Sequence, residues 1–255
     1  MLEKERHVYI MERLREKGFV SVRDLMKELD ISRSSAMRDL ISLESQGLLV
    51  REHGGATLHA VSETLSRRNE PAVNEKENVY SEEKAEICRL AALEIRDNTC
   101  IYIDSGTTTS YLLPYISDRD ITIVTPSLFL VRKLPEFFKG TVFIAGGMYD
   151  RKYDMVTGDF STQLIRQFNF DLALFSANGI NLKNGEVTLA DYNIAGMKQM
   201  VMKRCHRNVL LADSSKISQI AACTFANINE FDLVYIGRNT EEELPDNFIV
   251  AEGEK

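Results

Sequence analysis

The sequence lacks the features of several protein classes. Its 255 residues include no tryptophan, only five prolines and 14 glycines, and no long run of uninterrupted apolar residues. A membrane-spanning helix would need about 18 such residues in a row, and a low-complexity or collagen-like protein would need far more proline and glycine. Residues 1–6 are mostly charged and open a helical pattern, which is not typical of a signal peptide. We therefore expect a cytoplasmic protein with no membrane partner.

Cysteine is scarce as well. Cys88, Cys100, Cys205 and Cys223 are scattered along the chain, with no CxxC pair and no histidine at the spacing of a metal ligand. A disulfide framework or a zinc site would require closer spacing. We expect reduced thiols that fill core space, no bound metal and no cofactor.

The charge is unevenly divided along the chain. Of the 31 Lys and Arg and the 38 Asp and Glu residues, ten of each sign lie in residues 1–58, so the whole net charge of −7 falls on the remainder. An acidic protein is a poor partner for nucleic acid, whereas a neutral module with clustered arginines can bind phosphates through its local field. This asymmetry indicates two parts with different tasks.

Residues 1–58 show the pattern of a winged helix-turn-helix. Apolar residues at helical spacing predict helices over residues 3–17, 22–30 and 33–46, with residues 19–20 as a short extended link. Ser21 and Ser32 are placed to cap the second and third helices, and the short turn between them is that of a helix-turn-helix. Residues 48–51 and 56–58 fit a two-stranded hairpin, because Gly54 and Gly55 can supply the positive φ of a tight turn.

The start of the third predicted helix favours contact with DNA. Residues 32–38 carry serines and arginines and no acidic residue. Short hydroxyls let a helix N-terminus approach phosphates at the major groove, and an arginine reaches guanine O6 and N7. The alternative is a solvated helix face with serines that act only as caps, but the adjoining wing favours DNA. The expected DNA-binding residues are Ser21, Ser32, Arg33, Ser34, Ser35, Met37, Arg38, Arg51, His53 and Gly54.

Residues 59–80 are predicted to link two domains. They are mostly polar, contain Pro71 and show no sustained apolar period. Arg67 and Arg68 within this segment are either a solvated charge pair or contacts to the DNA backbone.

From residue 81 onward, strands and helices alternate. Short apolar segments predict strands at residues 100–103, 121–125, 142–145, 172–176, 209–212 and 233–236, with a late edge strand at 247–251. Helices are expected at residues 82–96, through 112–113, and at 127–134, 162–168 and 195–205. Apolar strands separated by helices indicate a mostly parallel sheet covered on both faces. The predicted fold class is α/β, with an N-terminal winged helix-turn-helix followed by a mostly parallel α/β domain over residues 81–255.

Unusual loops follow these strands, where ligands bind in an open α/β sheet. The turn of residues 104–109 has a glycine and three threonine hydroxyls and offers a nest for a phosphate, although an ordinary capped turn has the same composition. Lys216 and Lys152 are candidate cations for an anionic ligand; the alternatives are an ion pair of Lys216 with Asp213 and a solvated Lys152. The expected ligand-binding residues are Asp104, Ser105, Gly106, Thr107, Thr108, Thr109, Thr125, Ser127, Gly146, Gly147, Lys152, Asn178, Gly179, Asp213 and Lys216.

Two groups of motifs resemble the DeoR family of bacterial transcriptional regulators. The first is ISRSSAMRDL with LE, QGLL and REHGGA (residues 31–40, 43–44, 46–49 and 51–56), and the second is DSGTTT with LADSSK (residues 104–109 and 211–216). The family usually has two consecutive arginines where this sequence has Met37-Arg38. The resemblance implies an effector domain that is similar in fold to ribose-5-phosphate isomerase and recognises phosphorylated sugars or related metabolites.

The leading interpretation is a DNA-binding transcriptional regulator without enzymatic activity, acting as a repressor of a sugar-metabolism operon under control of a phosphosugar. One winged helix contacts too few base pairs for useful specificity, so we expect a homodimer or a higher homo-oligomer on double-stranded operator DNA. The alternative is a sugar-phosphate isomerase with an appended DNA-binding domain, in which Asp104, Asp191 or Asp213 would abstract a proton. No histidine lies at any predicted strand end, which disfavours catalysis.

Overall fold

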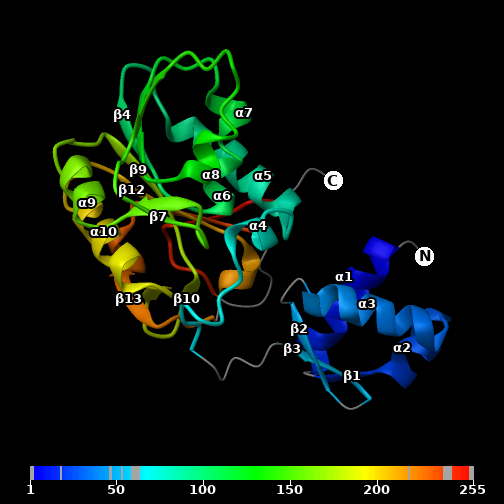
Figure 1. Cartoon of the computed structure of the whole chain (residues 1–255). Coiled ribbons are helices and arrows are strands. Elements are labelled where there is room, and N and C mark those ends of the chain that lie inside the picture. Colours follow the sequence, from blue (N-terminus) through cyan, green and yellow to red (C-terminus); the bar gives the residue numbers. More distant parts are fainter. Residues whose placement is uncertain are drawn as a thin grey trace. The chain divides into compact units, whose positions relative to one another are not determined.

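The computed structural model describes residues 3–17, 19–45, 48–52, 54–58, 64–217, 219–237 and 243–252. The chain divides into two compact units, Met1–Glu63 and Thr64–Lys255. In Figure 1 the helices and strands of the first unit are blue, and the second unit runs from cyan to red.

The first unit consists of three helices and a three-stranded antiparallel sheet. Its elements are α1 (Glu3–Lys17), β1 (Phe19–Ser21), α2 (Val22–Leu29), α3 (Arg33–Ser45), β2 (Leu49–Glu52) and β3 (Gly55–Leu58). The predicted winged helix-turn-helix is confirmed. Its wing has one strand more than expected, because the segment predicted as an extended link, β1, pairs with β3 in the order β1-β3-β2.

Short-range contacts explain where these elements end. Ser21 Oγ accepts a hydrogen bond from the Asp24 N–H at 3.0 Å and caps α2, which ends at Asp30 in the left-handed conformation (φ 52°). Gly54 has the expected positive φ of 86°. Gly55 does not; it is needed because a Cβ there would lie 2.1 Å from the carbonyl oxygen of Val20.

The core of the first unit follows the predicted helical pattern, with an exception on α3. Ile41 is apolar but 46% exposed, whereas the charged Asp39 is 2% exposed. Arg6 Nε and Nη2 donate to the Asp39 carboxylate at 2.6 and 2.9 Å, which ties α3 to α1. Burial of a charge is tolerated here because the carboxylate is paired and hydrogen-bonded. The apolar core consists of Ile10, Leu14, Val20, Val22, Leu25, Ala36, Leu40, Leu43, Leu49 and Ala56.

The second unit is built on a seven-stranded sheet in which all neighbouring strands are parallel. The strand order is β15-β14-β12-β9-β4-β5-β6. All seven predicted strands are present: β4 (Cys100–Ile103), β5 (Thr122–Thr125), β6 (Thr141–Ile144), β9 (Leu172–Ser176), β12 (Asn208–Ala212), β14 (Leu233–Ile236) and β15 (Phe248–Val250).

Helices cover both faces of this sheet (Figure 1). The first layer holds α5 (Ser81–Ala91), the 3-10 turn η1 (Ala92–Glu94), α6 (Thr107–Ser110), α7 (Leu113–Ile116) and α8 (Leu128–Val131). The second layer holds α9 (Asp159–Ile165) and α10 (Tyr192–Met202). Side chains of the strands alternate between the layers: Ile101 and Ile103 pack in the core under α5, whereas Tyr102 packs in the core under α10.

Shorter elements were not predicted from the sequence. They are α4 (Val73–Lys76), the hairpin of β7 (Met148–Asp150) and β8 (Met155–Thr157), the antiparallel sheet of β10 (Gly179–Asn181), β11 (Glu186–Leu189) and β13 (Cys223–Asn227), and the 3-10 turns η2 (Ser214–Lys216) and η3 (Ile228–Glu230). None of them exceeds five residues, which is too short to show a reliable hydrophobic period.

The prediction of a linker over residues 59–80 is wrong for its second part. Residues 64–80 belong to the second unit, where Leu65 forms a β-bridge with Ala221 and the Val73 N–H donates to the Lys152 carbonyl at 2.9 Å. Arg67, expected to be solvated or bound to DNA, pairs with two carboxylates of the second unit. Most of these contacts are polar, so they left no apolar pattern in the sequence. Residues 59–63 lie outside the described residues.

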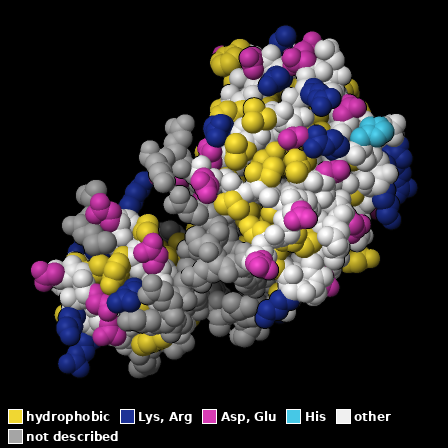
Figure 2. Space-filling view, turned by 180° about the vertical axis from the view of Figure 1, so that it is seen from behind, with side chains coloured by type: hydrophobic (Ala, Val, Ile, Leu, Met, Phe, Trp, Pro, Cys, Tyr) yellow, Lys and Arg dark blue, Asp and Glu magenta, His cyan; other side chains and the backbone are white. Residues whose placement is uncertain are grey.

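The described residues contain no helix that is long and apolar enough to cross a membrane, and no cluster of His, Cys, Asp or Glu that could hold a metal ion. The four cysteines are free; Cys88 is buried and the other three are half-buried. On the face of the second unit drawn in Figure 2, basic and acidic side chains are interspersed, with hydrophobic side chains visible between them. This face therefore shows no broad basic field of the kind that tracks a nucleic-acid backbone.

Candidate functional site

Helix α3 presents the exposed polar surface expected of a recognition helix. Ser32 Oγ accepts a hydrogen bond from the Ser35 N–H at 3.2 Å and lies 2.8 Å from Ser34 Oγ. The Arg38 guanidinium reaches back over the same turn, 3.4 Å from both the Ser34 carbonyl and Ser35 Oγ. Arg33 is exposed, and its side chain has no ion pair among the residues that the structure describes. Both arginines are therefore available to an external anion.

Arg51 of the wing differs from these two arginines. Its Nε donates to Glu44 Oε2 of α3 at 2.5 Å, and its backbone N–H donates to Glu44 Oε1 at 3.0 Å. These backbone and side-chain hydrogen bonds from Arg51 lower the pKa of Glu44. Arg51 thus joins wing and helix, and a contact with DNA would have to compete with Glu44.

Most of the other residues that were predicted to bind DNA stabilise the fold of the first unit. Ser21 caps α2, and Met37 is partly buried against the core of the first unit. Gly54 forms the turn of the wing and is exposed. His53 lies outside the described residues.

In the second unit, the strand order reverses between β4 and β9. From β4 the chain proceeds to β5 and β6 at one edge of the sheet, and from β9 to β12, β14 and β15 at the other. Open parallel sheets bind ligands beyond the carboxyl ends of the strands at such a point. Asp104 follows β4 there and Ser176 ends β9; Ser176 donates to Asp104 Oδ2 from its N–H at 2.9 Å and from its hydroxyl at 2.7 Å.

Asp104 is an internal anchor of this region. It is fully buried, and its Oδ2 lies 2.5 Å from Nζ of Lys198 on α10. Lys198 also donates to the Ser176 carbonyl at 2.6 Å. Asp104 Oδ1 is buried and has no hydrogen-bond partner among the described residues. The ion pair therefore holds α10, β4 and β9 together beneath the point of reversal.

The turn of residues 104–109 is closely packed. A Cβ at Gly106 would lie 2.7 Å from Ser176 Oγ, so only glycine fits against β9. Thr109 Oγ1 donates to the Asp104 and Gly106 carbonyls at 2.9 and 3.0 Å, which leaves that hydroxyl committed to the turn. Thr108 is 5% exposed. Within the predicted phosphate nest, the hydroxyl of Thr107 contacts a buried lysine, Lys84.

Lys84 of α5 brings a buried cation to Thr107. Lys84 is 2% exposed, and its Nζ donates to Thr107 Oγ1 at 3.0 Å and to the Lys76 carbonyl at 2.6 Å. Burial lowers the pKa of Lys84 to about 8; Asp213 raises this pKa, and Lys216 and Lys76 lower it further. Both hydrogen-bond acceptors are neutral although an ammonium carries three donors. Within the described part of the chain, the ammonium thus has no carboxylate at hydrogen-bonding distance.

Asp213 and Lys216 lie near this cation, after β12. Asp213 Oδ1 accepts from the Ser215 N–H at 3.2 Å and is 3.7 Å from Lys216 Nζ. The ion pair that was the alternative interpretation of Lys216 is therefore present. Burial raises the pKa of Asp213, but Lys216 and Lys84 outweigh burial and hold that pKa below its usual value. One carboxylate is thus shared by two lysines.

Other residues expected to bind a ligand are used by the protein itself. Thr125 Oγ1 accepts from the Ser127 N–H at 3.1 Å, and Ser127 Oγ accepts from the Leu130 N–H at 3.0 Å as the cap of α8. A Cβ at Gly179 would lie 2.0 Å from the Gln219 carbonyl, so this glycine permits a close approach of two backbone segments. None of these three predicted residues exposes a side-chain donor to a ligand in this conformation.

Four more of the predicted ligand-binding residues lie in or beside the β7–β8 hairpin. Gly146 and Gly147 are exposed and lead from β6 into β7. Lys152, between β7 and β8, donates through Nζ to the carbonyl of Arg67. Ser105 donates to Met155 Sδ of β8 at 3.0 Å, which places the hairpin over the turn of residues 104–109.

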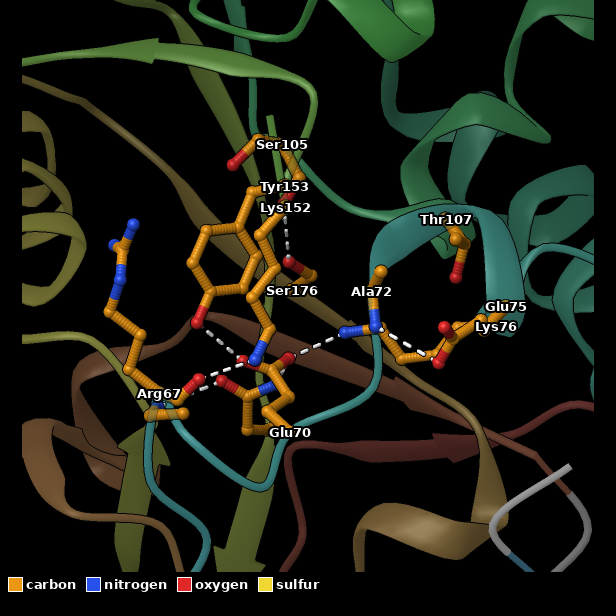
Figure 3. A network of polar contacts seen from close by, with 12 residues as sticks. Arg67, Glu70, Ala72, Glu75, Lys76, Ser105, Thr107, Lys152, Tyr153 and Ser176 are labelled. Atoms are coloured by element: carbon orange, nitrogen blue, oxygen red, sulfur yellow. Dashed lines mark hydrogen bonds and ion pairs between the residues drawn. The ribbon is translucent and has the colours of Figure 1, made fainter. Parts of the chain in front are cut away.

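The segment of residues 64–80 covers the same strand ends. Figure 3 shows the side chains of Lys76 and Tyr153 converging on Glu70, near Ser105 and Ser176 of the strand ends. Asn178, which was also predicted to bind the ligand, donates to Glu70 as well, with Nδ2 2.5 Å from Oε1. A cavity of about 610 Å³ opens beside this network and is lined by, among others, Glu70, Arg132, Arg151 and Lys152.

Comparison with known proteins identifies both units. Residues 6–61 match the DeoR-like helix-turn-helix domain, and residues 79–238, more than half of the chain, match the DeoR C-terminal sensor domain. The chain belongs to the DeoR family. It is a DNA-binding transcriptional regulator of that family and not an enzyme.

Several DeoR-family relatives match over nearly the full length. An HTH-type transcriptional regulator FruR of Bacillus subtilis is 31% identical over 97% of this chain and 96% of its own. An L-fucose operon activator of Haemophilus influenzae is 28% identical (93% of this chain and 92% of its own), and the repressor GlcR of Bacillus subtilis is 27% identical (93% and 90%). A solved ribose 5-phosphate isomerase of Methanocaldococcus jannaschii shares 11% identity and a TM-score of 0.40 over 54% of each chain, which is too low to carry an argument.

Sequence reasoning missed two lysines of the DeoR sensor domain. Lys84 and Lys198 lie on the apolar faces of α5 and α10 and are 2% and 1% exposed. Lys84 precedes the buried Ile87 and Cys88 by three and four residues, and Lys198 follows the buried Ile194 by four. A lysine at a core position of a helical stripe is itself a signal, because charged groups are rarely buried without a partner.

Proposed function

We propose that this DeoR-family regulator is a cytoplasmic repressor of a sugar-metabolism operon, and that a phosphorylated sugar bound at the β4–β9 reversal controls its affinity for DNA. The observation that supports this most is the buried Lys84 ammonium beside Thr107, whose hydrogen-bond acceptors among the described residues are both neutral. A phosphate group would supply the missing negative charge, with Lys216 as a second cation. The names of the relatives, which refer to fucose operon control and to repression, agree with a sugar-linked regulator.

The DNA-binding part of the proposal rests on the exposed start of α3. Ser34, Arg33 and Arg38 occupy positions from which a recognition helix contacts phosphates and base edges. Because one such helix reads few base pairs, a homodimer or higher oligomer would read two half-sites.

Effector control requires that the sugar bind the DNA-competent and incompetent states with different affinity, typically by ~1–3 kcal/mol. Residues 64–80 are placed to transmit this difference. They cover the strand ends and continue along the chain toward the DNA-binding unit.

A ligand screen tests the proposal directly. Thermal unfolding of the full chain should be measured with a panel of pentose and hexose phosphates and the matching free sugars. At a concentration 100 times its Kd, the true effector should stabilise the protein by about 2.7 kcal/mol. The same compound should release DNA that the wild type selected from a random pool. Stabilisation by free sugars alone, or by no compound, would refute the phosphosugar; stronger DNA binding would refute repression relieved by the effector.

Arg38→Ala should weaken specific DNA binding by about 10- to 100-fold, because one arginine contact to a base or phosphate contributes ~1–3 kcal/mol. In the described part of the chain, the Arg38 side chain hydrogen-bonds only to its own helix turn, at 3.4 Å, so the thermal midpoint should not change. Fluorescence anisotropy with the selected DNA at fixed salt measures the effect.

Arg96→Ala is the matched control for Arg38→Ala, since it removes the same charge from an exposed position in the sensor domain. It should bind DNA like the wild type. Equal DNA affinity of both variants at matched salt would place the recognition surface elsewhere than on the start of α3.

Effector binding should weaken above pH 8. Burial lowers the pKa of Lys84 to about 8, so the ammonium that receives the phosphate is lost within the alkaline range. Once the pH exceeds that pKa, affinity should fall by about tenfold per unit. Calorimetric titrations from pH 7 to 9.5 measure this, and a constant affinity over that interval would contradict a role for Lys84.

The contribution of Lys84 to folding stability should rise with pH, whereas effector affinity should fall. Its folded pKa of about 8 lies below the ordinary value of 10.5, so between these values the unfolded chain binds more protons and stability from this group rises with pH. Cysteine and tyrosine residues with raised pKa values, such as Cys205 and Tyr235, act against this trend. The measurement is therefore the stability of the wild type minus that of Lys84→Met, which should increase from pH 7 to 10.

A further inference from the structure

Glu70 lies on a segment of the chain that neither family match covers. The matches end at residue 61 and resume at residue 79, whereas the structure packs residues 64–78 onto the sensor domain. Backbone hydrogen bonds join Leu65 to Ile220 and Ala222 at 2.9 and 2.8 Å, and Arg67 pairs with Asp150 and Asp191. We call residues 64–78 the strap.

The Glu70 carboxylate of the strap is buried and hydrogen-bonded. Its side chain is 1% exposed, and both oxygens are bound. Lys76 Nζ and Asn178 Nδ2 each lie 2.5 Å from Oε1, and Tyr153 Oη donates to Oε2 at 2.6 Å. Burial raises the pKa of Glu70, but the charge of Lys76 and the three hydrogen bonds outweigh burial and keep the carboxylate ionised.

Two of the three donors belong to the body of the sensor domain and are already oriented toward an anion. Asn178 Oδ1 accepts from the Ala190 N–H at 2.9 Å, which fixes the amide with Nδ2 directed at Glu70. Asn178 follows β9 by two residues and so lies at the strand ends. Tyr153 comes from the turn between β7 and β8, and Figure 3 shows its hydroxyl directed at Glu70. These donors would remain in place if the strap were lifted.

An opening beside the strap makes the Glu70 residue, which these donors hold, reachable from outside. Glu70 lines the cavity of about 610 Å³ together with the cationic Arg132, Arg151 and Lys152. Of these, Arg151 is exposed and has no ion pair among the residues that the structure describes. The lining also includes two further carboxylates, one of which pairs with Arg132, so Arg151 is the cation that an entering anion would contact.

We propose that Asn178 and Tyr153 form an oxyanion subsite of the effector site, that Glu70 occupies it as an internal anion in the ligand-free protein, and that an oxyanion of the effector displaces Glu70 and frees the strap. This inference rests on the proposed function, since it names a second anchoring point for the same effector. The donor set accepts a carboxylate or a phosphate, and the effector would bear one such group here in addition to the phosphate at Lys84. Displacement converts ligand binding into release of the segment that leads to the DNA-binding unit.

The first test needs no ligand. Full-length wild type, Glu70→Gln and Glu75→Gln are digested briefly with trypsin, and cleavage after Arg67 or Arg68 is followed by fragment mass. Glu75 is the matched control because it is exposed, lies on the same strap and, among the described residues, accepts only from the nearby Ala72 N–H. Glu70→Gln should be cleaved at least fivefold faster than the wild type, and Glu75→Gln at the wild-type rate. Equal cleavage of all three would overturn the internal-anion role.

The second test uses two probes, inorganic phosphate and acetate. The probe that fits the subsite should accelerate cleavage of the wild type in a saturable way and should bind Glu70→Gln at least fivefold more tightly, because no internal anion competes. Binding to Glu70→Gln that is equal to or weaker than binding to the wild type, for both probes, would overturn displacement. A response to phosphate alone or to acetate alone identifies the oxyanion.

Asn178→Asp keeps the inference testable if Glu70→Gln is poorly folded. The aspartate retains the acceptor for the Ala190 N–H but turns a second carboxylate toward Glu70. Repulsion should release the strap, while probe binding should become weaker rather than tighter. Unchanged cleavage would contradict the proposal. Failure of all phosphorylated sugars in the ligand screen, with strap release intact in these variants, would refute the proposed effector and leave the internal anion standing.

Discussion

Lys84→Met is expected to weaken binding of the phosphorylated effector by about 100-fold or more, because truncating one partner of a buried charge pair costs ~2–5 kcal/mol. Lys84 is 2% exposed and its Nζ contacts Thr107 Oγ1 and the Lys76 carbonyl. Methionine preserves the length and the apolar stem but removes the ammonium. Isothermal titration calorimetry with the effector from the ligand screen measures the loss.

The same substitution should leave the fold almost unaffected. Removing the ammonium leaves two neutral acceptors without their donor, but it also relieves the desolvation of a charge that binds no carboxylate among the residues described. These effects oppose each other, so the thermal midpoint should move by no more than about 4 °C. DNA affinity without effector should stay at the wild-type level. If a folded Lys84→Met protein still bound the effector as tightly as the wild type, the proposed phosphate position beside Lys84 would be wrong.

Lys198→Met is expected to have the opposite profile, with a loss of folding stability of ~3–5 kcal/mol, because it leaves a buried carboxylate unpaired. Asp104 is fully buried, its Oδ2 is 2.5 Å from Lys198 Nζ, and its Oδ1 has no partner among the described residues. The sensor domain should unfold about 10 °C lower, as measured by differential scanning calorimetry.

A double variant separates the ion pair from simple packing. In Asp104→Asn with Lys198→Met, neither charge of this ion pair remains, and an amide oxygen can still accept from the Ser176 N–H. We expect it to recover at least half of the loss, which a double-mutant cycle would record as coupling. A double variant as unstable as the sum of the single ones would show that Lys198 acts through packing alone. Together, the Lys84→Met and Lys198→Met measurements would distinguish a ligand-binding lysine from a structural one.

The winged helix-turn-helix was predictable because its signals are local. Caps such as Ser21, the left-handed turn at Gly54 and the apolar spacing of α1 to α3 each act over a few residues. Strands β4, β9 and β12 were predictable for a related reason: they are buried on both faces and read as continuous apolar segments. The burial of Asp39 was not foreseen, because its partner Arg6 lies 33 residues away.

The candidate effector site was predicted only in part. The turn of residues 104–109 lies at the β4–β9 reversal, as expected for a strand-end loop, but its neighbours were misjudged. Thr125, Ser127 and Gly179 satisfy backbone groups or permit close packing, and such local uses carry the same sequence signature as ligand binding. Lys84 was overlooked because a lysine on an amphipathic helix is normally solvated.

The sequence by itself determined the two units, their fold classes and the family, because hydrophobic period, caps and strand-end motifs are encoded within short stretches of chain. Only the tertiary structure decided which partner each buried charge has. It brought Lys84 to Thr107, Lys198 to Asp104, and Glu70 to Asn178. The physical reason is that a buried charge is stable only beside a partner of suitable geometry, and that partner can come from any distance along the chain.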